Sequence, residues 1–155
     1  MNWDDYKNEF DADGGLRDIY VKDTSLKDWQ RFMDYLRKTE ARLEYFVDNE
    51  VQALPAEIDE IFQNREHARL LSIDLGGVSL NCDFFVLDQI ELDFDPCNIR
   101  SEAQANVVFR LMSTVARVLD KVVILTYENE SQQPVFKYQP GKGLEYLAPK
   151  KYSVS

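Results

Sequence analysis

The sequence predicts a two-layer α+β sandwich, with a mostly antiparallel sheet, helices on one face and an acidic open face. Three observations lead to this fold class. Gly76-Gly77 joins two runs that alternate apolar and polar residues, which is typical of a β-hairpin with a two-residue turn. A third alternating run follows at 90–95. Two other stretches, 26–36 and 107–119, repeat apolar residues at helical spacing.

The hairpin predicts its own register. A two-residue turn gives the apolar pairs Leu75/Val78, Ile73/Leu80 and Leu71/Cys82. The third run then turns Ile90, Leu92 and Phe94 inward if an odd-length loop, such as 85–89, precedes it. A slip of one residue would bury three carboxylates, so the register is well specified.

All charged side chains on the polar face of these strands are acidic, because no Lys or Arg occurs between Leu70 and Ile99. One interpretation is the solvated surface of an acidic protein. The other is a docking surface for a basic partner, since complementary charge steers association. For that reading the predicted partner-binding residues are Asp74, Asn81, Asp83, Glu91, Asp93 and Asp95.

The chain begins with an acidic segment, 1–15, for which two interpretations stay open. The spacing of Trp3, Tyr6 and Phe10 is that of a short helix, but a mobile acidic tail is equally compatible with the composition. The next run, from Leu16, predicts the first strand, with Ile19 and Val21 inward and Asp18 outward.

The central elements follow from caps and periodicity. Ser25-x-x-Asp28 has capping-box spacing before the first amphipathic helix. Residues 42–54 read as a second hairpin, and Pro55 opens a short helix. Pro96 ends the third central strand, since proline cannot donate to a ladder.

The C-terminal part predicts one long helix and two strands. Ser101 and Gln104 have capping-box spacing, and the helix runs behind them. The apolar run 122–127 suits a strand, and 134–138 a final strand whose leading proline suggests a sheet edge. The predicted organisation is a single domain over 16–147, followed by a C-terminal tail, 148–155, with a Lys150-Lys151 pair.

Composition limits the function. A chain of 155 residues suits one domain, and a net charge of -10 argues against a nucleic-acid partner. No apolar run approaches the ~20 residues that span a bilayer, and the acidic N-terminus does not resemble a signal peptide, so we expect a cytoplasmic protein with no membrane partner. Cys82 and Cys97 make neither a disulfide framework nor a metal site.

No catalytic constellation emerges, and we expect no enzyme activity and no cofactor. His67 is the only histidine, so any Cys-His or Ser-His scheme must use it. Asp93 and Asp95 with Asp74 or Asp83 offer oxygen ligands to a divalent ion, but a flat strand face lacks a wrapping loop. We therefore predict no metal site.

Two segments carry a resemblance to a known class of protein. LRDIYVKDTSLKDW and, further on, LLSIDLGGVSLNCDFF resemble small acidic bacterial immunity proteins of polymorphic or contact-delivered toxin systems. The likeness covers 16–138 and concerns size, charge and architecture, with no site motif to carry over. It implies a non-enzymatic protein that binds a basic partner, such as a toxin domain.

Two other functions stay open. A small-molecule or divalent-metal-binding domain requires a cleft, for which Tyr20, Tyr45, Asp93 and Asp95 are the candidate lining. A self-associating structural module requires an uncovered edge, for which 134–138 is the candidate. The sequence indicates no oligomeric state.

Overall fold

The computed structural model describes residues 1–63 and 66–147. In this part of the chain the strands form one nine-stranded sheet of order β3-β2-β4-β5-β6-β1-β7-β8-β9, and every neighbouring pair is antiparallel. The strands are β1 Arg17–Lys22, β2 Arg42–Val47, β3 Glu50–Gln52, β4 Arg69–Leu75, β5 Val78–Asp83, β6 Gln89–Phe94, β7 Val123–Tyr127, β8 Phe136–Gln139 and β9 Gly143–Tyr146. The α-helices are α1 Trp3–Tyr6, α2 Leu26–Lys38, α3 Asp59–Gln63 and α4 Glu102–Leu119, and the 3-10 turns are η1 Lys7–Phe10 and η2 Pro96–Asn98.

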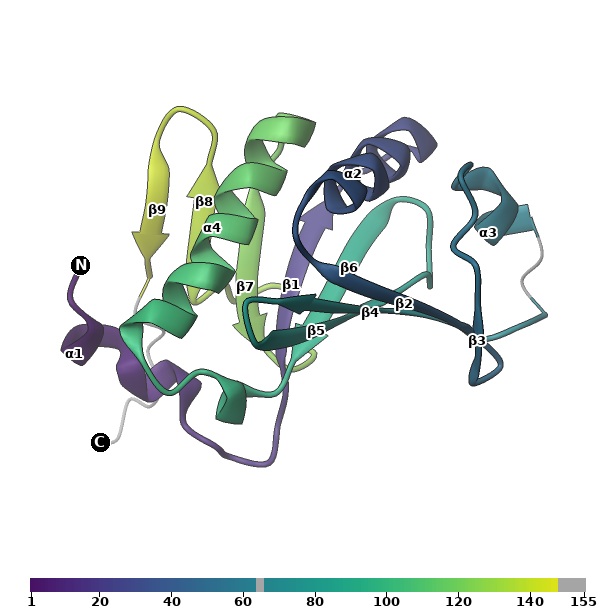
Figure 1. The fold of residues 1–155 in the computed structure, drawn as a ribbon. Coiled ribbons are helices and arrows are strands. Elements are labelled where there is room, and N and C mark those ends of the chain that lie inside the picture. The colour runs from purple at the N-terminus through teal and green to yellow at the C-terminus, as the bar shows by residue number, and fades with distance from the viewer. Residues whose placement is uncertain (64–65, 148–155) are drawn as a thin grey trace.

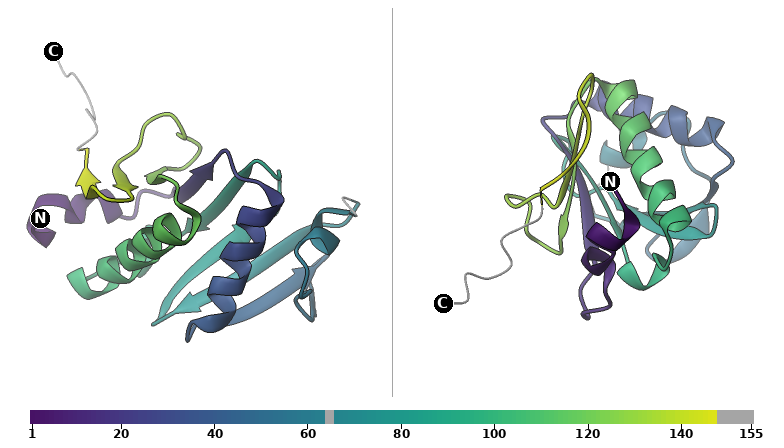
Figure 2. Two further views of the ribbon diagram at one scale, coloured as in Figure 1. Left: turned by 90° about the horizontal axis from the view of Figure 1, so that it is seen from above. Right: turned by 90° about the vertical axis from the view of Figure 1, so that its left-hand side faces the viewer.

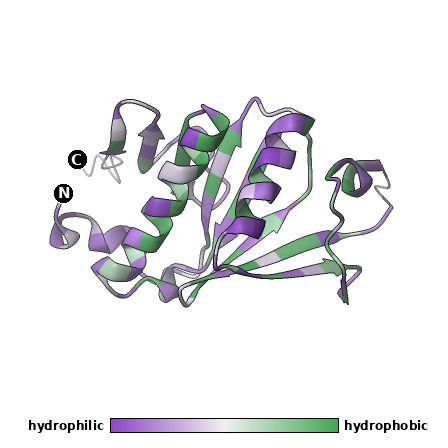
Figure 3. Ribbon diagram, turned by 45° about the horizontal axis from the view of Figure 1, so that its top comes forward, coloured by the Kyte–Doolittle hydropathy of each residue, from purple (hydrophilic) through white to green (hydrophobic). Residues whose placement is uncertain are grey.

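The two long helices, α2 and α4, lie on the same face of the sheet, which confirms the predicted α+β sandwich (Figure 1, Figure 2). Seen with the sheet nearly edge-on, both helices stand on one side of it (Figure 2). The outer surface of α2 is hydrophilic, whereas the strands behind it are hydrophobic in patches (Figure 3). The core therefore fills the space between this pair of helices and the sheet.

The central hairpin has the predicted register. Gly76 and Gly77 have φ of 56° and 86°, a conformation that glycine adopts without steric cost. The observed pairs are Leu71↔Cys82, Ile73↔Leu80 and Leu75↔Val78. The next connection is five residues long, 84–88, and brings Leu92 opposite Cys82. Local pattern alone was sufficient here because one face of these strands is buried.

The two long helices begin at the predicted N-cap residues, Ser25 and Ser101. Ser25 Oγ accepts from Asp28 N at 3.2 Å and the Asp28 carboxylate accepts from Ser25 N at 2.9 Å, which completes the capping box. Before α4, Ser101 Oγ accepts from Gln104 N at 3.3 Å, but the Gln104 side chain accepts from Arg100 N instead. Ser101 therefore caps α4 as predicted, but the reciprocal half of the predicted capping box does not form.

The C-terminal end of the sheet differs from the prediction. An additional strand, β9, pairs with β8 on the side away from β7, so the expectation that 134–138 forms a sheet edge is wrong. Gly141 and Gly143 both have positive φ and allow the chain to reverse between these strands. In the described chain β3 and β9 form the two edges of the sheet, and the predicted tail, 148–155 with Lys150 and Lys151, lies outside the described residues (Figure 1).

The N-terminal segment packs against the core as a short helix and a 3-10 turn, the first of the two interpretations. Tyr6 and Phe10 are buried, and the Tyr6 ring lies 5.5 Å from that of Phe109 on α4 and 5.7 Å from that of Phe136 on β8. Tyr6 and Phe10 therefore belong to the same core cluster as Phe109 and Phe136. The aromatic spacing was the correct signal.

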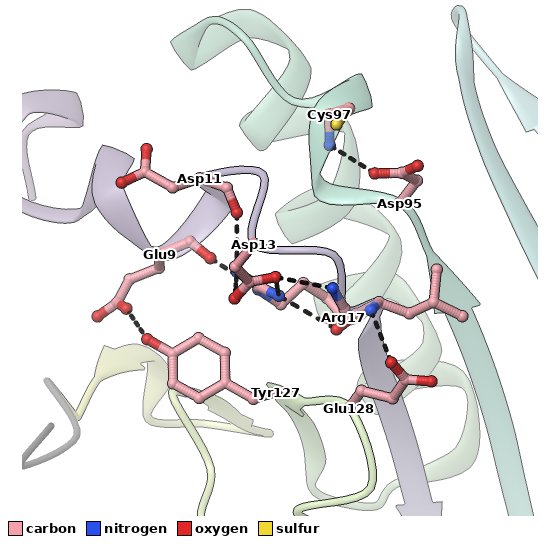
Figure 4. A network of polar contacts seen from close by, with 10 residues as sticks. Glu9, Asp11, Asp13, Arg17, Asp95, Cys97, Tyr127 and Glu128 are labelled. Atoms are coloured by element: carbon pink, nitrogen blue, oxygen red, sulfur yellow. Dashed lines mark hydrogen bonds and ion pairs between the residues drawn. The ribbon is translucent and has the colours of Figure 1, made fainter.

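A buried arginine holds the same segment to the sheet (Figure 4). Arg17 is 2% exposed; its Nε donates to Glu9 O at 2.8 Å, and its Nη2 donates to Asp11 O and Asp13 Oδ2, both at 3.2 Å. The Arg17 guanidinium lies 4.7 Å from the centre of the Tyr127 ring, and Tyr127 Oη donates to the Glu9 carboxylate. Because buried charges require partners, this network makes residues 9–13 part of the folded domain.

Candidate functional site

Four of the predicted partner-binding residues meet on adjacent strands of the face opposite the helices. The register pairs Asn81 with Asp93 and Asp83 with Glu91 across β5 and β6. Asn81 Nδ2 donates to Asp93 Oδ1 at 3.2 Å. Side chains of directly paired residues project to the same face, so these four form one continuous polar surface.

Asp18 joins this surface from the other side, and sequence reasoning missed it. Strand β1 pairs with β6, which places Asp18 opposite Asp93 and Tyr20 opposite Glu91. Asp18 is 4% exposed, and its Oδ2 accepts from Tyr20 Oη at 2.9 Å. The alternation in β1 predicted that Asp18 points outward. It could not predict that Asp18 lies opposite Asp93, because that pairing depends on the order of the strands in the sheet. We call Asp18, Asp83, Glu91 and Asp93 the acidic cluster.

The pKa values of three carboxyl groups of the acidic cluster, Asp83, Glu91 and Asp93, are raised. Burial, and then the neighbouring Asp93 carboxylate, raise the pKa of Asp83 from 3.8 to about 6. Burial and the Asp18 carboxylate raise the pKa of Glu91. Burial also raises the pKa of Asp93, although the hydrogen bond from Asn81 opposes the change. These carboxylates therefore repel one another in a partly desolvated place.

No cation relieves this repulsion in the described part of the chain. Among residues 1–63 and 66–147 the side-chain ion pairs lie elsewhere, for example between Arg37 and Asp34 and between Lys121 and Asp28. The same residues contain no group of three or more His, Cys, Asp or Glu side chains that could hold a metal ion. The cluster offers a complementary surface to an external positive charge.

The two remaining predicted residues have local roles away from the acidic cluster. Asp74 Oδ1 accepts from Gly77 N at 3.2 Å and supports the hairpin turn. Asp95 Oδ1 accepts from Cys97 N at 2.9 Å, and this hydrogen bond lowers the pKa of Asp95. The structure thus brings Asp83, Glu91 and Asp93 together but not Asp74 or Asp95.

The connection between β7 and β8 covers one side of the cluster. Asn129 N donates to Asp18 Oδ2 at 2.8 Å, and Lys22 Nζ donates to Ser131 O at 2.8 Å. Asp18 and Tyr20 are consequently buried although they point away from the helices. The accessible part of the cluster is the side formed by Asp83, Glu91 and Asp93, all of which are partly exposed.

A cavity of about 510 Å³ opens beside Asp83. Its apolar lining comes from β2, α3, β4 and the loop between β5 and β6, and its polar lining includes Arg69 and His67. His67 Nδ1 lies 2.6 Å from Asp48 Oδ2, and this contact lowers the pKa of Asp48. The cleft proposed from Tyr20, Tyr45, Asp93 and Asp95 does not form, because Tyr45 is buried on the helix side.

Neither cysteine is set up as a nucleophile with the histidine. Cys82 is fully buried, and burial raises the pKa of its thiol. Cys97 is exposed, and its hydrogen bond with Asp95 raises the pKa of its thiol. Neither thiol lines the cavity that contains His67. A reactive cysteine needs a lowered thiol pKa, and both shifts have the opposite sign.

Comparison with known proteins adds no family. No family model, no curated protein and no solved structure matches this chain. Within the described residues, every helix is too short or too polar to cross a membrane.

Proposed function

We propose that the protein is a non-enzymatic binding module, an immunity-type inhibitor that neutralises a basic toxin domain through the acidic cluster. The observation that carries the proposal is the gathering of Asp83, Glu91 and Asp93 on one sheet face, with raised pKa values and no counter-ion in the described residues. A surface selected only for solubility would intersperse both signs of charge. A lysine or arginine of a partner would relieve the repulsion.

The physical consequence is fast, salt-sensitive association. Complementary charge accelerates encounter, and salt screens exposed charges within a Debye length of about 8 Å at physiological ionic strength. Such an inhibitor would act in the cytoplasm, where the free thiols of Cys82 and Cys97 stay reduced.

The test begins with affinity capture from the source organism at low salt. Recovered proteins are identified, and each basic candidate is then purified and titrated against the wild type and against Glu91→Gln/Asp93→Asn. We expect a loss of about 2–5 kcal/mol of binding free energy in the double variant, because it removes charges from a desolvated interface. Protection from the candidate's toxicity in co-expression should weaken in parallel.

Glu44→Gln is the matched control. Glu44 is exposed on the same sheet face, opposite Ser72 in the register, and Ser72 is in turn opposite Asn81. It changes the net charge in the same direction at a place outside the cluster. Equal affinity of the double variant and the wild type would refute the proposal, as would failure to recover any basic protein.

A second candidate function is a small-molecule-binding domain, which the 510 Å³ cavity favours because ligand sites have volumes of about 300–1,000 Å³. The melting temperature of the protein alone, with and without a candidate metabolite, distinguishes the two functions. A metabolite that fills the cavity raises the melting temperature without a partner protein, and its effect persists in high salt if apolar contact dominates.

A further inference from the structure

The cavity is continuous with an apolar strip on the same sheet face as the acidic cluster. Cross-strand pairing sets up one row, in which Val51, Phe46, Leu70, Asp83 and Glu91 follow one another across five strands. The row is apolar from the β3 edge to β4 and acidic from β5 onward. Val51 is 64% exposed, although valine is usually buried.

The loop between β5 and β6 adds exposed apolar groups at the junction. Phe85 is 63% exposed and Val86 is 41% exposed. Phe84, next to them, turns inward, where its ring lies 5.3 Å from that of Trp29. Phe84 thus packs against the core, whereas Phe85 lines the cavity and is largely exposed. Large apolar side chains gathered in one exposed place mark interaction sites.

Among the described residues, the cavity has an apolar wall and one acidic side chain. Phe46, Phe62, Leu70 and Phe85 supply the wall, and Asp83 lines the same space while belonging to the acidic cluster. The two cationic candidates in the lining have partners of their own. Arg69 Nη1 donates to Tyr45 Oη at 2.7 Å, and His67 contacts Asp48. Arg69 keeps its positive charge, but Tyr45, on the helix side of the sheet, holds its guanidinium. Asp83 belongs to the opposite face, so on that face the charge beside the cavity is that of Asp83 and, beyond it, Glu91 and Asp93 among the described residues.

We infer that the cavity receives one large apolar side chain from a segment of a basic protein, and that a lysine or arginine beside that side chain meets Asp83 and Glu91. The inference rests on the proposed function and names the chemistry of the partner's contacting segment. Aromatic anchors in desolvated pockets, surrounded by charged pairs, dominate the binding energy of many interfaces. A partner with acidic flanking residues would be repelled by the same carboxylates.

The test uses three blocked synthetic peptides as probes, followed by amide chemical shifts of the full chain at low salt. The first is Lys-Lys-Trp-Lys-Lys, the second replaces its tryptophan by alanine, and the third replaces its lysines by glutamates. We expect the first peptide to shift the amides of Leu70, Asp83 and Phe85, and the second to bind about tenfold more weakly. The third should not bind.

Two variants localise the contact. Phe85→Ala removes an exposed part of the cavity wall, and we expect it to reduce binding of the tryptophan peptide to the level of the alanine peptide. Val118→Ala removes a side chain of α4 that is 36% exposed, and it should change nothing. Both positions are at the surface, so both variants are expected to fold.

The outcomes separate the inference from the proposed function. If both lysine peptides bind equally and shift only Glu91 and Asp93, the cavity is not used and the inference is overturned, while the acidic-cluster proposal stands. If the glutamate peptide binds as tightly as the lysine peptide, the basic character of the partner is overturned. If no peptide shifts this face, both proposals fail.

Discussion

Replacing Asp83 by Asn should stabilise the protein at neutral pH. Asp83 is half-buried, and burial together with the neighbouring Asp93 raises its pKa to about 6. In the unfolded chain its pKa returns to the ordinary value of 3.8. Between these two values the native state keeps a proton that the unfolded state has released. The free energy of unfolding must therefore fall as pH rises through this window.

The magnitude follows from the two pKa values. A displacement from 3.8 to about 6 corresponds to about 3 kcal/mol if it acts in full. Partial exposure and solvent screening reduce this to about 1–2 kcal/mol at pH 7.5. Asparagine has nearly the same shape and can donate to Asp93, so the variant removes the repulsion without opening a cavity. The melting temperature should rise by about 2–4 °C for each kcal/mol gained.

The assay is urea unfolding at several pH values from 4 to 8, for the wild type, Asp83→Asn and Glu44→Gln. We expect the stability of Asp83→Asn relative to the wild type to increase between pH 4 and 6, because only the wild type carries the carboxyl group whose pKa is raised. Glu44→Gln should follow the wild type, because Glu44 is exposed and lies two strands from Asp83 in the sheet. A destabilised Asp83→Asn at pH 7.5, or an unchanged pH slope, would refute the electrostatic reasoning.

Three further variants test the core, the N-terminal network and a cap. Leu80→Asp places a carboxylate opposite Ile73 in the buried layer. The cost of several kcal/mol is a large part of a typical free energy of unfolding of about 5–15 kcal/mol, so we expect the variant to unfold. Soluble expression with an unchanged melting curve would contradict the assignment of the strand faces. Arg17→Met removes the donor to the Glu9 and Asp11 carbonyls and the ion pair with Asp13, and we expect a loss of about 2–4 kcal/mol in urea titration; an unchanged midpoint would mean that aromatic packing alone holds the segment. Ser25→Ala removes the acceptor at the start of α2 and should cost about 1 kcal/mol by calorimetry, whereas no change would show that Asp28 caps the helix unaided.

Local pattern predicted the central hairpin, the helix starts and the two long helices, but it missed β9, which the turn through Gly141 and Gly143 joins to β8. The Gly76-Gly77 turn sets the pairing of β4 with β5 because a two-residue turn allows only one register, and the five-residue loop carries that register to β6. Asp83, Glu91 and Asp93 could be placed together from the sequence because they lie on two consecutive strands, β5 and β6. The spacing of Trp3, Tyr6 and Phe10 also predicted a helix, but it could not choose between a docked segment and a tail.

The sequence by itself determined the faces of the strands, the helix caps and the one-signed charge between Leu70 and Ile99, since each depends on residues close together in the chain. Only the tertiary structure decided that β1 lies between β6 and β7, and hence that Asp18 completes the acidic cluster. Strand order depends on which long-range pairings pack best together. The alternation of apolar and polar residues within one strand carries no information about which strands lie beside it. The cavity beside Asp83 has the same origin, because its lining combines side chains of β2, α3, β4, β5 and the loop between β5 and β6.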